Sequence, residues 1–307
     1  MDIPAKPWPT GLSERCEPLV RRVLAPNASH YTFTGTQTYI VGAADQVAVI
    51  DPGPADAAGE SEPSPFKGAD TNGKGHVEAI LAAVGPARIA AIMCTHTHRD
   101  HSPAAAVLKA ATGAPIIGCA PLTISDDGPR ADSAFDHSYA PDRVLKDGER
   151  LTGPDWTIEA VATPGHTSNH LCYGLVESRA LFTGDHVMAW STSVVSPPDG
   201  DMAAYMASLD KLYDRGDTVF YPAHGPAILK TRQLVRGMLG HRRSREAQIL
   251  RLLAQAPHVI PDMVAAMYKG LDPRLTGAAG RSVLAHLIDL RSRGQVSDEG
   301  EQWRVIS

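Results

Sequence analysis

The chain of 307 residues has few of the features that mark membrane, secreted or nucleic-acid-coating proteins. No stretch approaches the roughly 18 consecutive apolar residues of a membrane span. Residues 1–10 contain three prolines and no apolar core of a secretory signal. Only four cysteines occur, without a CxxC pair, so we expect reduced thiols in a cytoplasmic protein rather than a disulfide framework. The net charge of −5 argues against a uniformly basic surface that would attract nucleic acid.

What is present is the composition of an ordinary globular protein, with 43% hydrophobic and 21% charged residues. The charge is unevenly distributed. From Thr231 to the end there are 12 Lys and Arg against 7 Asp and Glu, so this part carries +5 and the remainder carries −10. A solvated helical surface explains such an excess, and a phosphate-binding surface is the alternative.

The first two thirds of the sequence alternate between strand-like and helix-like segments, which predicts a layered α/β domain with sheet at its centre. The expected helices are His76–Val84 and Pro103–Ala111. The expected strands are Thr38–Val41, Val47–Ile50, Ile89–Cys94, Pro115–Gly118, Thr157–Ala162, Leu171–Val176 and Ala180–Thr183. Residues 57–75 and 125–142, rich in Gly, Pro, Ser and Asp, are expected to be long loops that bind ligand or act as lids; the first can equally be a disordered insertion.

The sequence pattern changes near residue 228, so we predict one domain over 1–228 and a smaller one over 229–307. The second domain is expected to contain the helices Thr231–Ala254, Pro261–Tyr268 and Gly280–Arg293. A hairpin is expected over Gln295–Ile306, with its turn at Asp298–Gly300. Helices followed by a terminal hairpin predict a winged-helix-like domain.

The segment Thr95–His101 contains four metal-binding side chains within six residues, namely His96, His98, Asp100 and His101. It follows the apolar run Ile89–Cys94 and precedes Ser102 and Pro103, a pair typical of a helix start with Ser as N-cap. We therefore expect these side chains on a loop at the carboxyl end of a strand, where α/β sheets usually place their sites. Cys94 is expected to be a small core residue rather than a ligand.

Three more candidate ligands follow, each on a Gly- or Pro-bearing turn after an apolar strand: His166, Asp185 and His224. Singly, each can be a hydrogen-bonded turn residue. Together with the first motif they supply seven nitrogen and oxygen donors, which suits two first-row cations. We predict a binuclear site with zinc as the expected metal; manganese or iron is the alternative, because His and Asp ligands accept all three.

The string His96-x-His98-x-Asp100-His101, with the three later ligands in order, resembles the metallo-β-lactamase-fold hydrolases. The resemblance covers residues 20–230 and implies a four-layer αββα sandwich. It implies that one metal is held by His96, His98 and His166, and the other by Asp100, His101 and His224. It further implies that Asp185 bridges both metals, and that Asp51 supports the site without binding metal.

Other segments resemble the beta-lactamase-like protein 2 group of this family: Gly35–Tyr39, Ser191-Thr192, Tyr205–Leu209, His241-Arg242, Arg245-Glu246 and Gln248–Leu250. With the winged-helix-like domain, they extend the resemblance to nearly the whole chain. Members of this group include an endoribonuclease acting on single-stranded RNA, so that activity is the main expectation. Asp185 stands where some β-lactamases have a Cys ligand, which points away from those enzymes.

The chemistry follows from the metals. Two cations about 3.5 to 4 Å apart lower the pKa of a bridging water toward about 7, so we expect a hydrolase that uses a metal-bridging hydroxide. Asp100 is the expected catalytic residue, because its carboxylate can orient the hydroxide and pass its proton to the leaving group. The alternative is that Asp100 is a ligand only.

The substrate stays open between single-stranded RNA and a small molecule with a thioester, lactone or β-lactam bond. Only the basic C-terminal part favours RNA. A remote alternative is a nucleic-acid-binding protein with structural metals; a seven-donor set argues against it, since structural zinc sites are closed four-ligand shells. No membrane partner is expected, and no heptad or apolar stripe predicts an oligomeric state.

Several histidines lie outside the predicted ligand set. His170 is expected to be hydrogen-bonded at a strand end, with the alternative that it orients His166. His137, in the second loop, is a candidate substrate contact. His241, on the long helix, is expected at the surface or between the domains, with the mouth of the site as the alternative.

Overall fold

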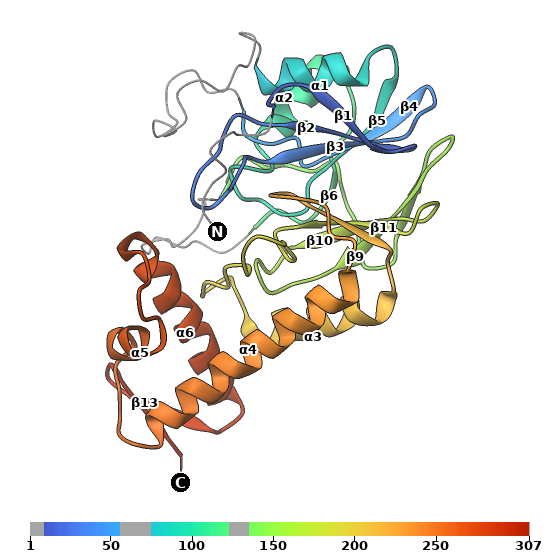
Figure 1. Ribbon diagram of the computed structural model, residues 1–307. Coiled ribbons are helices and arrows are strands. Elements are labelled where there is room, and N and C mark those ends of the chain that lie inside the picture. The colour runs from blue at the N-terminus through green and yellow to red at the C-terminus, as the bar shows by residue number, and fades with distance from the viewer. Residues whose placement is uncertain (1–8, 56–74, 123–134, 307) are drawn as a thin grey trace.

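The computed structural model describes residues 9–55, 75–122 and 135–306, and its centre is a pair of five-stranded sheets (Figure 1). The first sheet consists, in order, of β1 (Ser13–Glu17), β2 (Val20–Leu24), β3 (Gln37–Val41), β4 (Gln46–Ile50) and β5 (Arg88–Met93). The second consists, in order, of β12 (Val219–Pro222), β11 (Ala180–Gly184), β10 (Leu171–Leu175), β9 (Thr157–Ala162) and β8 (Arg150–Thr152). In each sheet one pair of strands is parallel, β4 with β5 and β11 with β12.

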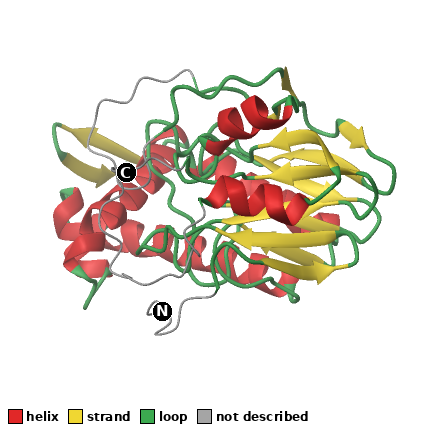
Figure 2. Cartoon of the chain, turned by 90° about the horizontal axis from the view of Figure 1, so that it is seen from above, coloured by secondary structure: helices red, strands yellow, loops and turns green. Residues whose placement is uncertain are grey.

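Helices cover the outer faces of the two sheets, so the chain forms four layers (Figures 1 and 2). Helices α1 (His76–Val84) and α2 (Ala104–Thr112) pack on the first sheet. Helices α3 (Met202–Arg215) and α4 (Thr231–Leu253) pack on the second. The expected αββα sandwich is confirmed.

Side chains of the second sheet alternate between two cores, as the two-residue period of a strand requires. Those on one face contact the first sheet, namely Ala160, Tyr173, Phe182 and Tyr221. Those on the other face contact α3 and α4, namely Val161, Cys172, Leu181 and Phe220. The sheet is therefore buried on both faces, which is why its strands appear in the sequence as nearly continuous apolar runs.

Aromatic side chains join the two sheets at the centre of the sandwich. The ring of Tyr39 lies 5.0 Å from that of Phe182 and 5.6 Å from that of Tyr221. Two buried hydroxyls bond from one sheet to the other: Tyr39 donates to the carbonyl of Pro222 (2.7 Å) and Tyr173 to that of Cys94 (2.6 Å). These bonds tie the end of β12 to β3 and the end of β5 to β10 across the sandwich, and both β12 and β5 lead into predicted ligand loops. Cys94 itself is a buried free thiol.

The C-terminal part contains α5 (Ile260–Met267), a short 3-10 helix (Pro273–Leu275), α6 (Thr276–Ser292) and a hairpin of β13 (Val296–Glu299) and β14 (Gln302–Val305). Its core includes Met263, Val283, Leu287 and Trp303. The long helix α4 serves both cores: Val235 and Met238 pack with α3, and Ile249 and Leu253 pack with α5 and α6. One continuous helix thus fixes the second core relative to the first, and a division of the chain at residue 228 stays a prediction.

Some elements lack the sequence patterns used above. Strands β1, β2, β7 (Arg143–Val144) and β8 and helix α3 were not expected. β1 reads Ser-Glu-Arg-Cys-Glu and is largely exposed at the edge of its sheet, so no apolar alternation marks it. Helix α3 had a signal, because the Asp201 side chain caps it by accepting from the backbone N–H of Ala204 (2.7 Å).

Two local predictions are corrected. Helix α2 begins at Ala104 with Pro103 as its N-cap, and the Ser102 hydroxyl donates to Asp136 (2.8 Å) instead of capping the helix. The C-terminal hairpin turns at Gly300 and Glu301, because Asp298 and Glu299 are still paired with β14. Gly300 has a φ of 62°, a conformation that suits glycine at a tight turn.

The two predicted loops fall largely outside the described residues, over 56–74 and 123–134. The described end of the second loop folds back on the ligand motif, where Phe135 stacks on His98 with ring centroids 4.9 Å apart. A short strand, β6 (Ile117–Gly118), pairs with β7 nearby. None of the helices in the described ranges is long and apolar enough to span a membrane.

Substituting His286 tests the energetics of the buried C-terminal core. This side chain of α6 is 2% exposed, and burial, with the nearby Arg242 charge, lowers its pKa to about 3. Between pH 6.5 and about 3 the unfolded chain binds a proton there that the folded chain does not, so stability falls as the pH falls. We expect His286→Leu to remove about 2 kcal/mol of the stability loss between pH 8 and pH 5.

Urea unfolding of the metal-free protein at each pH measures this difference. His137→Leu, at an exposed position, is the control. Curves of stability against pH that run parallel for wild type and His286→Leu would contradict the assignment.

Candidate metal centre

The predicted ligands meet at one edge of the sandwich, between the two sheets. The loop after β5 brings four of them: Asp100 and the imidazoles of His96, His98 and His101, which are at most 2% exposed. Turns after β9, β11 and β12 bring the other three side chains, His166, Asp185 and His224. These loops are far apart in the sequence, but they lie together because the strands that precede them end at the same edge of the sandwich.

Three imidazoles form a first cluster. The Nε2 atom of His96 lies 2.9 Å from Nδ1 of His98, which lies 3.2 Å from Nε2 of His166. Zinc–nitrogen bonds of about 2.1 Å in a tetrahedron place ligand atoms about 3.4 Å apart, so these spacings suit one cation with three nitrogen ligands.

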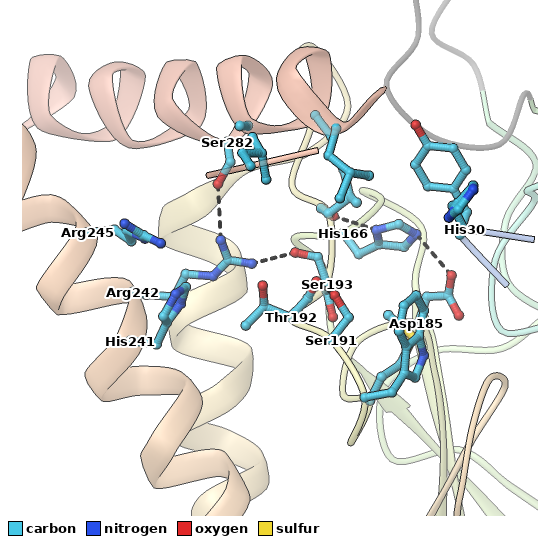
Figure 3. A pocket seen from close by; sticks show the side chains of 18 of the residues that line it. His30, His166, Asp185, Ser191, Thr192, Ser193, His241, Arg242, Arg245 and Ser282 are labelled. Carbon is cyan, nitrogen blue, oxygen red and sulfur yellow. Dashed lines mark hydrogen bonds and ion pairs between the residues drawn. The ribbon is translucent and has the colours of Figure 1, made fainter. Parts of the chain in front are cut away.

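A second cluster lies beside the first and mixes carboxylates with imidazoles. Asp100 Oδ2 is 3.4 Å from His101 Nε2 and 3.2 Å from His224 Nε2. Asp185 Oδ1 is 3.6 Å and 3.3 Å from the same two nitrogens. The other oxygen of Asp185 faces the first cluster, 3.8 Å from His166 Nε2 (Figure 3). Asp185 therefore lies between the two clusters, with one oxygen toward each.

The donor set fits two divalent cations. Three buried atoms that face one another in the second cluster have no hydrogen-bond partner among the described residues: His101 Nε2, Asp185 Oδ1 and His224 Nε2. Buried polar atoms of a folded protein normally have a hydrogen-bond partner. Nitrogen and oxygen atoms that lack one and lie close together therefore indicate a metal ion as the missing partner. Imidazole and carboxylate ligands suit zinc and related first-row metals.

Hydrogen bonds to the opposite ring nitrogens aim the imidazoles at these points. Nδ1 of His166 donates to the carbonyl of Val194 (2.6 Å), and Nδ1 of His224 donates to that of Gly35 (3.2 Å). Each bond leaves the Nε2 lone pair directed at its cluster. Gly35 has a φ of 119°, and a Cβ there would lie 2.3 Å from the Ala25 carbonyl oxygen, so only glycine fits.

Asp51 supports the loop of His96, His98 and His101 from beneath. One of its oxygens accepts from the backbone N–H of Thr95 (2.7 Å); the other accepts from the Thr95 hydroxyl (2.9 Å) and from Nδ1 of His101 (3.1 Å). It therefore fixes both the start of the loop and the ring of one ligand. Asp51 belongs to neither metal cluster.

The electrostatics differ between the clusters. Burial and the neighbouring imidazoles lower the pKa of His96 and His98 well below the ordinary value, so both are neutral and ready to bind a cation. In the second cluster burial lowers the pKa of His224, but the Asp185 and Asp100 carboxylates outweigh it and raise the pKa to about 9. Burial acts to raise the pKa of Asp185, but the His224 and His101 imidazoles bring it well below its usual range. A cation bound here at neutral pH therefore displaces protons.

The remaining histidines have other surroundings. Nδ1 of His170 bonds to the Thr163 hydroxyl (2.9 Å), and the ring stacks on His96 at 5.2 Å, so His170 packs against the site. No hydrogen bond joins it to His166 within the described ranges, which overturns the alternative that it orients that ligand. His137 is exposed, outside the residues that line the cavity at the metal centre. His241 lines the cavity from α4, where the two parts of the chain meet.

A cavity of about 270 Å³ leads from the two clusters to the C-terminal helices (Figure 3). At one end it is lined by the ligands His98, Asp100, His166 and Asp185. Helix α4 contributes His241, Arg242 and Arg245, and the C-terminal core contributes Tyr268, Leu271, Leu275 and Ser282. Both parts of the chain therefore build the wall of one pocket.

Most of this wall was missed from the sequence. His30, Trp190 and Tyr268 carry no local motif that marks a pocket. The segments Ser191-Thr192, His241-Arg242 and Arg245-Glu246 were noted as points of resemblance, with only His241 also considered near the site, and several of their residues line the cavity. The gathering of these segments of resemblance outside the ligand motifs was the sequence signal that could have revealed the pocket wall.

Residues 31–224, well over half of the chain, match the family model described as the metallo-beta-lactamase superfamily. The chain belongs to the metallo-beta-lactamase superfamily. Residues 260–303 match the beta-lactamase associated winged helix domain, which confirms the predicted C-terminal fold. The superfamily match and the thioesterase names of relatives indicate a hydrolase.

Two fungal relatives are named as atrochrysone carboxyl ACP thioesterases. The protein from Aspergillus fumigatus is 31% identical over 236 residues, which cover 76% of this chain and 64% of that protein. The protein from Aspergillus terreus is 29% identical over 278 residues, covering 85% and 76%. These names favour the thioester alternative over RNA cleavage, and membership of the endoribonuclease-type group stays a prediction.

Solved structures show the same fold over nearly the whole chain. A beta-lactamase domain protein from Burkholderia ambifaria superposes with a TM-score of 0.76 at 19% identity, covering 98% of this chain and 96% of that one. A metallo-beta-lactamase family protein from Thermus thermophilus gives 0.71 at 21% identity, covering 95% and 100%. The metallo-beta-lactamase domain and the C-terminal helices therefore recur together.

The metal count tests the two clusters. We expect the zinc-loaded wild type to hold two metal ions per chain and His166→Ala, which removes one of three nitrogens of the first cluster, to hold about one. Elemental analysis after exhaustive dialysis measures this number. His30→Ala, at a pocket residue outside both clusters, is the control and should retain two. Two tightly held ions in His166→Ala would overturn the first cluster.

Asp51 is predicted to tune the metal affinity without binding metal. Asp51→Asn removes the charge that holds the His101 ring, and loss of such a supporting contact typically lowers metal affinity about 10- to 100-fold. Competition with a zinc chelator measures the effect, with the exposed Asp45→Asn as the control. An unchanged zinc affinity in folded Asp51→Asn would refute this role.

Proposed function

We propose that this protein hydrolyses acyl thioesters in a reaction that depends on two divalent metal ions, with zinc as the expected metal. The observation that carries the proposal is the single cavity with metal ligands at one end and apolar and aromatic side chains along its wall, among them Met188, Trp190, Tyr268 and Leu271. Such a cavity suits an acyl chain whose thioester carbonyl reaches the ligands. The names of the two fungal relatives support the same bond type.

The protein's own groups supply the proton chemistry. When bound, the two cations would lower the pKa of a water molecule and polarise the thioester carbonyl. Asp100 lines the cavity. A carboxyl group beside two cations is ionised at neutral pH, so Asp100 can orient the attacking water and accept its proton.

The same carboxylate can then return the proton to the departing sulfur. Attack by water forms the new carbon–oxygen bond and breaks the carbon–sulfur bond, which gives a carboxylic acid and a thiol. A thiol has a pKa of about 8.5 and leaves more readily than an alcohol, so Asp100 suffices as the proton carrier.

Cleavage of single-stranded RNA is less well supported. Some of the cations after Thr231 are engaged in ion pairs: Arg293 pairs with Glu246 and Asp289, and Arg291 pairs with Asp298. A strand of RNA needs a row of free cations that follows its phosphates. The cavity is a confined pocket between helices, which suits a smaller acyl group.

A matched set of substrates tests the proposal. We expect the zinc-loaded protein to hydrolyse acyl thioesters of N-acetylcysteamine and coenzyme A, and Asp100→Asn to lower kcat about 100- to 10,000-fold, the usual effect of a general acid–base group. Rates are compared at equal metal content by following thiol release. Asp210→Asn, an exposed carboxylate of α3, is the control. Labelled single-stranded RNA is assayed in parallel, and RNA cleavage without thioester hydrolysis would refute the proposal.

A further inference from the structure

Two arginines of α4 face the pocket without a carboxylate partner. Arg242 is only 3% exposed, and Arg245 is half-buried next to it on the helix. Among the described residues, no Asp or Glu oxygen lies within ion-pair distance of either guanidinium. Figure 3 shows both on the α4 side of the cavity, with His166 and Asp185 on the other side.

The contacts of Arg242 are all with neutral groups. It donates to the Ser282 hydroxyl (3.1 Å) and to the Ser193 carbonyl, and its guanidinium lies 5.1 Å from the Tyr205 ring centroid. Its Nε atom is buried without a hydrogen-bond partner. These contacts hold the side chain in place, but they leave its positive charge uncompensated.

Arg245 has the same kind of surroundings. Its guanidinium donates to Gln248 (2.9 Å) and to the carbonyl of Met267 (3.0 Å), and it stacks 4.1 Å from the Tyr268 ring centroid. Its Nε atom is also buried and unpaired. The nearby Arg293, by contrast, has two carboxylate partners, Glu246 and Asp289. Arg293, outside the pocket, thus has carboxylate partners, whereas Arg242 and Arg245, which line the pocket, have none in the part of the chain that the structure describes.

The other unpaired groups on the pocket wall are also nitrogens. Beyond the metal ligands, the buried side-chain atoms of this wall without a partner are Trp190 Nε1, His241 Nδ1 and the two arginine Nε atoms. A buried charge without a counter-charge is unfavourable, and so is a buried N–H without an acceptor. Both costs are relieved by one kind of ligand, an anion with several acceptor oxygens.

We propose that Arg242 and Arg245, with His241 beside them, form an anion subsite that selects thioester substrates carrying a carboxylate or a phosphate. The inference rests on the proposed thioesterase function and adds the substrate class. The anion is either a carboxylate on the acyl chain or a phosphate on the thiol portion; both present the oxygens that the guanidinium groups bind. The thioester carbonyl then lies toward the metal ligands at the other end of the cavity.

Four thioesters separate these two sources. Hexanoyl and adipoyl groups have the same chain length and differ by a terminal carboxylate. Each is joined to N-acetylcysteamine, which has no phosphate, and to coenzyme A, which has several. We expect wild type to prefer the anionic member of one pair by about 10- to 100-fold in kcat/KM, the range that charge-assisted hydrogen bonds supply. The pair that shows the preference identifies the source of the anion.

Arg245→Gln keeps a hydrogen-bonding side chain and removes the charge. We expect it to abolish most of this preference through a raised KM for the anionic substrate, with kcat and the neutral substrate little changed. Arg245→Lys should restore part of the preference. Arg243→Gln, one of the exposed arginines of the same helix, is the matched control and should behave like wild type. Equal rates on all four thioesters in wild type, or an equal effect of Arg245→Gln on all four, would overturn the proposal.

Binding of inorganic phosphate tests the subsite without turnover. Calorimetry on the metal-loaded proteins should give a dissociation constant for phosphate that is about 10-fold higher for Arg245→Gln than for Arg243→Gln. A protein that hydrolyses no thioester but shows this difference would refute the proposed function and retain an anion subsite. Identical phosphate affinities in the two variants, together with no substrate preference, would remove the subsite.

Discussion

A buried carboxylate, that of Asp51, connects the centre of the first sheet to the metal-binding loop. The residue follows β4 in a left-handed conformation, with a φ of 48°, and accepts hydrogen bonds from Thr95 and His101. A buried carboxylate is stable only with such donors, and the loop keeps its shape only while they are bound. The positions of the ligands after β5 depend on this contact, because each of them follows Thr95 within six residues.

The two ends of the pocket come from different parts of the fold. Loops at the edge of the αββα sandwich supply the metal ligands, which are rigid because each strand before them is held in a buried sheet. The opposite wall comes from α4 and from the helices of the winged-helix domain. Since α4 packs into both cores, the distance between these ends is set by one continuous helix.

This division separates reactivity from selectivity. The metal clusters can serve any hydrolysis in which a carbonyl or phosphoryl group reaches them, so they do not choose the substrate. The charged and aromatic side chains on the opposite wall of the pocket select the substrate. The arrangement of Arg242 and Arg245 therefore matters more for the substrate than the net charge of the C-terminal part.

The sequence alone determined the elements and ligands that local patterns encode. Buried strands such as β5 and β11 appear as apolar runs, and His96, His98, Asp100 and His101 are close in the chain, so their common role was readable. The polar edge strand β1 left no such pattern. The pocket wall was also unreadable, because the burial of Arg242 is created by Ser193 and Ser282, which lie 49 and 40 residues away.

Chain-local periodicity thus predicted a layered α/β domain and the spacing predicted the donor set, while the four-layer sandwich was implied by the family resemblance. The tertiary structure decided which ends of the strands converge, which oxygen of Asp185 faces each cluster, and which arginines lack a counter-charge. The physical reason is that a side chain's charge compensation and burial are set by neighbours brought from distant segments, and no local pattern records them.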